Sequence, residues 1–226
     1  MVALGIDTST AAGSIGLAEG DSLLGEINLA AGGHHQERLL RGVDALLDLL
    51  GISIGSVSVI AVALGPGSFT GLRVGIATAK GLALARGIPA YGLSTLAAMA
   101  LHFRSRGLPV APVIDAGRRE VYAALFQVED GILRSIREEK VGPPEEFFTS
   151  LPREPILLCG DGVRRYRDRI PGDQGVERVL EPEGCFLGGT LARWGAEQFG
   201  RGSPWSLRAL KPNYLRPADA EVGRTR

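Results

Sequence analysis

Hydrophobic and polar residues recur along the chain with two different periods, which predict strands and helices in a defined order. Short apolar runs bounded by turn residues are typical of buried strands. In the first half of the chain they predict strands at Val2–Asp7, Ser14–Ala18, Ser22–Leu29, Val57–Leu64 and Ile88–Leu93. Apolar residues three or four positions apart predict amphipathic helices, which fall at His35–Leu50, Thr70–Arg86 and Ser94–Arg104. The predicted order is three strands, followed by helix and strand in alternation.

The second half of the chain opens with the same pattern. Pro109–Asp115 is apolar and ends in an aspartate, as Val2–Asp7 does. The strands and helical segments predicted after it are Glu120–Val128, Ile132–Val141, Pro144–Ser150, Ile156–Gly160, Asp161–Arg169 and Phe186–Gly200. Two halves that begin with strand, aspartate, strand and strand indicate a structural duplication. We therefore expect an α/β protein with two lobes, 1–104 and 105–226, and a mobile tail over the last six residues.

The charge balance and the cysteine content of the chain argue against several classes of protein, among them strong nucleic-acid binders and disulfide-rich or zinc-binding proteins. The chain has 25 basic and 25 acidic residues, and affinity for nucleic acid comes largely from neutralising phosphates. A partner would therefore supply most of the basic surface for any RNA. Its two cysteines, Cys159 and Cys185, predict neither a disulfide framework nor a zinc cluster. Without a signal peptide or an apolar run of about 18 residues, the sequence predicts a cytoplasmic protein that does not contact membranes.

A glycine-rich loop, Gly65–Arg73, joins a predicted strand to a predicted helix. Such a loop offers backbone N–H groups to an anion, but glycines equally allow two elements to pack closely. The loop lacks the Lys-Ser/Thr ending of a P-loop, and the sequence leaves both uses open. The candidate contacts to a nucleotide or anion are Asp7, Thr8, Gly65, Gly67 and Ser68. The alternatives are a hydrogen-bonded turn after the first strand and a helix cap at Ser68.

The sequence predicts neither a metal site nor a catalytic residue. His34 and His35 precede or open a helix, but the residues four positions on, Arg38 and Leu39, cannot complete a helical metal site. No G-x-S-x-G nucleophile elbow is present.

Two predicted helices, His35–Leu50 and Thr70–Arg86, carry more apolar residues than one core face requires. Surplus apolar surface favours a protein interface, although burial between a sheet and its neighbours is the alternative. The residues predicted to form the interface are His35, Leu39, Arg73, Ile76, Ala79, Lys80 and Ala83.

Six segments resemble those of one known family, in order along the chain. They are Gly5–Thr10, His35–Leu39, Gly65–Arg73, Gly92–Leu96, Asp115–Tyr122 and Pro212–Arg216. Together they are similar to the TsaB (YeaZ) family of bacterial tRNA-modification proteins over nearly the whole chain. The resemblance implies the two-lobed fold of actin, sugar kinases and Hsp70-type ATPases, in which each lobe is a mixed sheet flanked by helices.

The resemblance also implies a non-catalytic subunit. TsaB proteins pair with the paralogue TsaD and, with the ATPase TsaE, support transfer of threonylcarbamoyl to the adenosine next to the anticodon of certain tRNAs. TsaD holds a metal through a His-x-x-x-His pair, whereas this chain has His35 followed by Leu39. The family implies that the two N-terminal helices form the heterodimer interface, and a homodimer when the protein is alone. It implies contact with tRNA mainly through the complex and no required cofactor, with ATP or ADP an option at or near the partner interface.

An enzyme of the same fold is the alternative. Asp7, Thr8, Asp115 and the glycine-rich loop are the residues on which an ATP hydrolase or small-molecule kinase would depend. A glycoprotease, an older label for relatives of the family, is a weaker alternative because neither a metal pair nor a triad is present.

Overall fold

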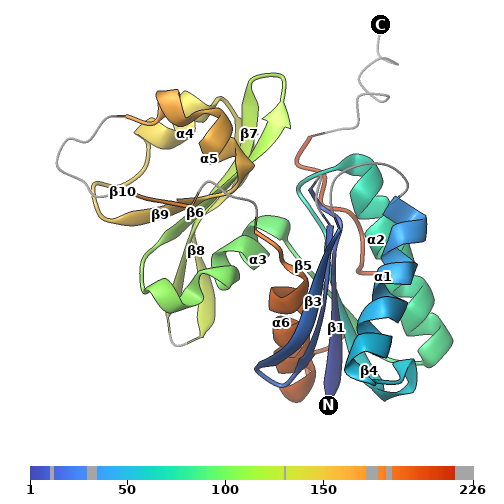
Figure 1. Ribbon diagram of the computed structural model, residues 1–226. Coiled ribbons are helices and arrows are strands. Elements are labelled where there is room, and N and C mark those ends of the chain that lie inside the picture. Colours follow the sequence, from blue (N-terminus) through green and yellow to red (C-terminus); the bar gives the residue numbers. More distant parts are fainter. Residues whose placement is uncertain (11–12, 30–34, 130, 172–177, 182–184, 217–226) are drawn as a thin grey trace, which may run out of the picture. The chain divides into compact units, whose positions relative to one another are not determined.

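Two five-stranded sheets form the centres of two units in the computed structural model of the chain (Figure 1). Each sheet contains both parallel and antiparallel strand pairs. The structure describes residues 1–10, 13–29, 35–129, 131–171, 178–181 and 185–216, with only the backbone of 35–37 and 178–181. The first unit combines Met1–Ala98 with Phe186–Asn213, and the second combines Met99–Cys185 with the segment that begins at Tyr214. The predicted α/β class with two mixed sheets is confirmed.

The sheet of the first unit has the strand order β3-β2-β1-β4-β5. Its strands are β1 (Val2–Asp7), β2 (Gly13–Glu19), β3 (Ser22–Leu29), β4 (Val57–Ala63) and β5 (Ala90–Leu93). The first three form an antiparallel meander, and β4 and β5 lie parallel to β1.

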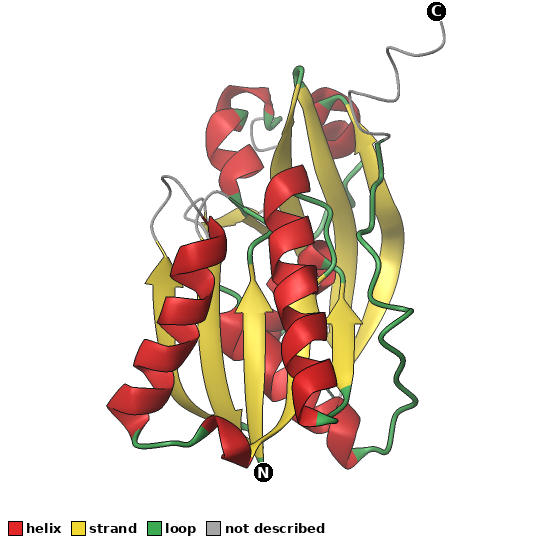
Figure 2. Cartoon of the chain, turned by 90° about the vertical axis from the view of Figure 1, so that its right-hand side faces the viewer, coloured by secondary structure: helices red, strands yellow, loops and turns green. Residues whose placement is uncertain are grey.

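Helices cover both faces of this sheet. Helices α1 (His35–Leu50) and α2 (Phe69–Arg86) lie side by side on one face, with α6 (Gly188–Gly200) on the other (Figures 1 and 2). Because side chains alternate along a strand, Leu4 and Ile6 of β1 join the core beneath α1 and α2, whereas Ala3 packs towards α6. Helix α3 (Thr95–His102) then leads into the second unit.

Glycines let α6 lie directly on the strands of the first unit. A Cβ atom at Gly5 would lie 2.0 Å from the carbonyl oxygen of Gly188, and one at Gly16 would lie 2.3 Å from the amide nitrogen of Gly189. The Ser14 hydroxyl accepts hydrogen bonds from the N–H groups of Leu187 and Gly188, at 2.9 and 2.8 Å. The sequence assigned this helix to a lobe spanning 105–226, and the structure differs because these contacts attach it to the first unit.

The sheet of the second unit repeats the topology of the first. Its order, β8-β7-β6-β9-β10, matches β3-β2-β1-β4-β5 strand for strand, with the same parallel and antiparallel pairs. The strands are β6 (Val110–Gly117), β7 (Glu120–Glu129), β8 (Ile132–Gly142), β9 (Ile156–Cys159) and β10 (Arg178–Glu181). The predicted duplication is confirmed, and β10, which the sequence did not predict, is the counterpart of β5.

Two short helices cover one face of the second sheet. Helices α4 (Pro144–Thr149) and α5 (Asp161–Arg165) pack over a core that includes Phe148, Leu158 and Val163. The helix predicted to continue to Arg169 is interrupted at Tyr166 and followed by a 3-10 turn. Across the described part of the chain, every helix is too short or too polar to cross a membrane. The predicted mobile tail lies outside the described residues.

Candidate functional site

Three segments meet where the parallel strands of the first unit end. This strand-end cluster consists of Asp7–Ser9 at the end of β1, the Gly65–Ser68 loop after β4, and Thr95 after β5. The Ser68 N–H group donates a hydrogen bond to the Ser9 carbonyl at 2.7 Å, and the Thr95 N–H group donates to the Gly65 carbonyl at 2.8 Å. The structure therefore brings together all five residues predicted to contact a nucleotide or anion, at the edge of a sheet where α/β proteins commonly bind ligands.

The glycines after β4 allow close packing within the cluster. A Cβ atom at Gly67 would lie 2.1 Å from the Ser9 carbonyl oxygen, and one at Gly71 would lie 2.1 Å from the Thr8 carbonyl oxygen. A Cβ atom at Gly75 would lie 2.2 Å from the Thr8 hydroxyl oxygen. Since these separations are far below contact distance, larger residues at these positions would displace the β1 end. The sequence left open whether these glycines serve anion binding or close packing, and the described contacts are those of close packing.

Polar groups of the cluster bind one another. The Thr8 hydroxyl donates a hydrogen bond to the Gly71 carbonyl at 2.7 Å. The Ser68 hydroxyl accepts a hydrogen bond from the Gly71 N–H group at 3.2 Å and so caps the N-terminus of α2. This is the helix cap that the sequence offered as the alternative to an anion contact. Thr8 and Ser68 are therefore engaged in internal hydrogen bonds.

Asp7 is the most perturbed group of the cluster. Its side chain is fully buried, and one carboxylate oxygen, Oδ1, accepts a hydrogen bond from the Ser9 N–H group at 2.8 Å. Burial raises the pKa of Asp7 from 3.8 to about 6, against the opposing effect of its hydrogen bond with Ser9 and with a small addition from the charge of Glu26. Among the described residues, no hydrogen-bond partner is present for Asp7 Oδ2, Ser9 Oγ or Thr95 Oγ1. The cluster therefore contains a carboxyl group whose pKa is about 6, beside unpaired polar atoms.

Asp115, the counterpart of Asp7 in the second unit, has several partners. One of its carboxylate oxygens accepts hydrogen bonds from the Gly117 N–H group at 3.1 Å and from the Tyr166 hydroxyl at 3.2 Å. The other oxygen lies 3.3 Å from a guanidinium nitrogen of Arg165. Through these contacts Asp115 joins β6 to α5, which is a structural role.

Four of the residues predicted to form a partner interface lie in the core of the first unit. Leu39 of α1 and Ile76, Ala79 and Ala83 of α2 are almost completely buried on the sides of these helices that face the sheet. The prediction that they face a partner is corrected, because they form the inner stripes by which the two helices pack on the sheet. Arg73 is exposed and Lys80 is half-buried, and the side chain of His35 lies outside the described residues.

The opposite face of α2 carries a row of exposed residues that we call the α2 outer stripe. It comprises Phe69, Arg73, Ala77, Gly81 and Leu84, which follow one another at intervals of three or four residues and so share one face. Leu84 is 74% exposed and Phe69 is 38% exposed. The Arg73 guanidinium carbon lies 3.9 Å from the centroid of the Phe69 ring. Of these residues, only Arg73 was predicted from the sequence. The signal that could have located the others is their spacing of three or four residues, which places them on the side of α2 away from its buried residues.

The expected absence of a metal site stays a prediction. Among the described residues, no group of three or more potential ligands is placed to hold a metal ion. His34 and the side chain of His35, however, fall outside the described part of the structure.

Comparison with known proteins identifies the family. Residues 29–158, more than half of the chain, match the family model "TsaD: tRNA N6-adenosine threonylcarbamoyltransferase". The chain is 40% identical to the tRNA threonylcarbamoyladenosine biosynthesis protein TsaB of Escherichia coli over 221 residues, which cover 94% of each chain. It is 30% identical to the protein of the same name from Bacillus subtilis, over 98% of this chain and 97% of the relative. The chain belongs to the TsaB family.

Solved structures agree with this assignment. YeaZ from Pseudomonas aeruginosa superposes with a TM-score of 0.81 at 32% identity, covering 95% of this chain and 99% of that one. Component A of the (R)-2-hydroxyglutaryl-CoA dehydratase of Acidaminococcus fermentans has a TM-score of 0.53 at 11% identity, a likeness of fold alone. The expected actin, sugar-kinase and Hsp70-like fold is thus confirmed for this member of the TsaB family.

Proposed function

We propose that this TsaB-family chain is a non-catalytic subunit of the machinery that makes threonylcarbamoyladenosine in tRNA. It pairs with a catalytic TsaD-type paralogue and acts with a TsaE-type ATPase in the cytoplasm. Together they support transfer of threonylcarbamoyl to the adenosine next to the anticodon, and tRNA is bound mainly through the complex. The names of the relatives support the pathway, and the α2 outer stripe is the observation that supports the role within it.

The α2 outer stripe has the properties of a protein-binding helix face. Its ends are the large apolar residues Phe69 and Leu84, and between them Ala77 and Gly81 have little or no side chain. Such a surface allows a second helix to approach closely while covering exposed apolar area. In our proposal the stripe contacts the TsaD-type partner, and a second copy of the chain when no partner is present. No cofactor is required by this role, and any ATP or ADP would bind at or near the partner interface.

The test is the tRNA modification reaction itself. Purified TsaD, TsaE, the synthase, threonine, bicarbonate, ATP and tRNA are combined with and without this chain, and the modified nucleoside is measured. We expect product only when the chain is present. Equal product in its absence would contradict the proposal.

A matched pair of variants tests the surface. Ala77→Arg introduces a long charged side chain into the stripe, so gel filtration with TsaD should lose the heterodimer and the reaction should lose product. Ala209→Arg places the same side chain at an exposed alanine outside α2 and should leave both unchanged. Normal pairing by Ala77→Arg would place the interface elsewhere and overturn the assignment of this surface.

The second candidate function is ATP hydrolysis or phosphoryl transfer by the chain itself. It is favoured by the three buried polar atoms without partners at Asp7, Ser9 and Thr95, and disfavoured by the internal hydrogen bonds of Thr8 and Ser68. Magnesium-dependent ATP turnover by the isolated protein, lost in Asp7→Asn, would support this candidate over the accessory role.

A further inference from the structure

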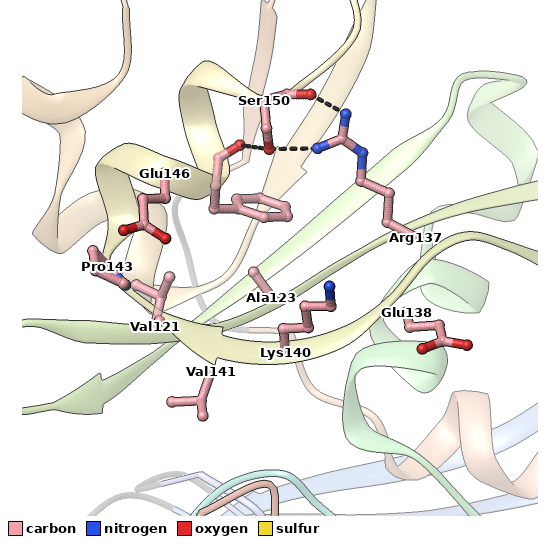
Figure 3. A pocket seen from close by; sticks show the side chains of 11 residues that line it. Val121, Ala123, Arg137, Glu138, Lys140, Val141, Pro143, Glu146 and Ser150 are labelled. Carbon is pink, nitrogen blue, oxygen red and sulfur yellow. Dashed lines mark hydrogen bonds between the residues drawn. The ribbon is translucent and has the colours of Figure 1, made fainter.

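The second unit contains a cavity of about 600 Å³ between β7, β8 and α4 (Figure 3). Its apolar lining includes Val121 and Ala123 of β7 and Phe147 of α4, and its polar lining includes Arg137, Lys140 and Glu146. The volume falls within the range of about 300 to 1,000 Å³ that is usual for small-molecule sites. All of these residues belong to the second unit.

An irregular strand brings the two cationic side chains to the same cavity. Lys140 lies opposite Ala123 in the ladder between β7 and β8, and Arg137 lies opposite Leu125. In a regular strand, residues three positions apart point to opposite faces. The register shift between these pairs adds one residue to β8, so that Arg137 and Lys140 instead share the face of Ala123 and Leu125. Re-aiming a side chain is a known use of β-bulges.

Arg137 is held in place at one end of the cavity. Its guanidinium group donates hydrogen bonds to the hydroxyl and the carbonyl oxygen of Ser150, at the C-terminal end of α4. These bonds join β8 to α4 and leave other guanidinium N–H groups available, since arginine has five. Arg137 is therefore pre-positioned, which lowers the entropy cost of binding an anion.

Lys140 supplies a second positive charge. Within the described part of the chain it has no ion-pair partner. Figure 3 shows Lys140 extending towards the space beneath Arg137, whereas the Glu138 carboxylate points away from that space and Glu146 lies on the opposite side of the cavity. The cavity consequently has a cationic end and an apolar floor.

We propose that this cavity binds a small organic oxyanion, a carboxylate or a phosphate ester, that carries an apolar body. The oxyanion binds to Arg137 and Lys140, because cationic side chains form charge-assisted hydrogen bonds with such groups. The apolar body lies against Phe147 and Pro143, above the buried side chains of Val121 and Ala123. Addition of a partner strand to β8 is disfavoured, because its two register shifts interrupt the regular ladder and its edge is rich in charged residues.

The experiment is a nuclear magnetic resonance titration of the full chain with four probes. Phenyl phosphate and octanoate each combine an oxyanion with an apolar body, inorganic phosphate has the oxyanion alone, and cyclohexanol has the body alone. We expect at least one of the first two to bind about tenfold more tightly than either partial probe. Comparison of phenyl phosphate with octanoate distinguishes a phosphate ester from a carboxylate. The amide shifts should concentrate in 121–123 and 137–150.

Charge variants complete the test. Lys140→Gln should weaken binding of the preferred probe about tenfold, whereas Lys211→Gln, at an exposed lysine of the first unit, should leave it unchanged. Thermal unfolding of both variants verifies that they are folded. The proposal is overturned if none of the probes binds at millimolar concentrations, if inorganic phosphate binds as tightly as the organic anions, or if the shifts lie outside these segments. Equal binding by the Lys140→Gln variant would overturn it as well.

Discussion

The two units share one strand topology but differ in the helix that covers the antiparallel meander. A long helix covers the meander of the first unit, whereas a short helix leaves a cavity beside the meander of the second. In the first unit β3 is followed by α1, a helix of 16 residues that packs over β2 and β3. In the second unit the counterpart strand β8 is followed by α4, a helix of only 6 residues. The cavity lies between α4, β8 and its neighbour β7. The shorter helix of the second unit therefore leaves room for a candidate binding site beside its meander.

The largest expected effect concerns the filled side of this comparison. Leu46 of α1 is almost completely buried in the core of the first unit, so Leu46→Ala should lower the free energy of unfolding by about 3 kcal/mol through lost burial and an unfilled cavity. Phe147→Ala, in the half-exposed wall of the open cavity, should cost about 1 kcal/mol. Urea unfolding measures both. Equal losses would show that α4 covers its sheet as effectively as α1 does.

The two units also differ in the aspartates at counterpart positions, Asp7 at the end of β1 and Asp115 near the end of β6. The pKa of buried Asp7 is about 6, against 3.8 ordinarily, so the folded chain binds more protons than the unfolded chain between these values. Stability should therefore fall as the pH rises from about 4 to about 6 and then level off, with a total loss of about 3 kcal/mol. Asp7→Asn should remove this dependence and stabilise the protein at pH 8 by up to that amount.

Two controls separate this effect from a general change in charge. Asp115→Asn should instead destabilise the protein by about 1 kcal/mol, because it weakens contacts with Tyr166 and Arg165. Asp44→Asn, at an exposed position of α1, should change stability by less than about 0.5 kcal/mol. Unfolding curves recorded from pH 4 to pH 8 test all three variants. An unchanged pH dependence in Asp7→Asn would show that Asp7 is not its source.

An effect smaller than that of Asp7 is expected at the contact between β8 and α4, at one end of the cavity. Arg137→Ala removes the hydrogen bonds that join β8 to α4 at Ser150. Because these groups are exposed, the expected cost is about 0.5 to 1 kcal/mol. Hydrogen exchange should accelerate in 144–150 and stay unchanged in α1. Faster exchange in both helices would indicate that stability is shared between the two units, contrary to the comparison.

Much of the fold was predictable because its local signals are strong. The ranges of β1, β3 and α1 were predicted to the residue, and the repeated strand-aspartate pattern predicted the duplication. The strand β10 was missed because Arg178–Glu181 has only two apolar residues, although the duplication requires a counterpart of β5.

The functional surfaces were less predictable because they depend on contacts between distant residues. The sequence located Gly67 and Gly71, but their use follows from Ser9 and Thr8, which approach from the end of β1. Apolar content located α2 as an interface helix but did not separate its buried face from the α2 outer stripe. The register shift that aligns Arg137 with Lys140 has no signature in the alternation of β8.

The contact of α6 with β1 and β2 constrains the order in which the protein can assemble during translation. Ser14 accepts its hydrogen bonds from Leu187 and Gly188, which are synthesised 173 and 174 residues later. Until then the glycine-lined face of the first sheet lacks its covering helix, while all strands of the second unit have already been made. The first sheet thus receives the helix on its second face only after the strands of both sheets have been synthesised, and a ribosome that stops before Phe186 releases a protein whose first sheet is exposed on one side.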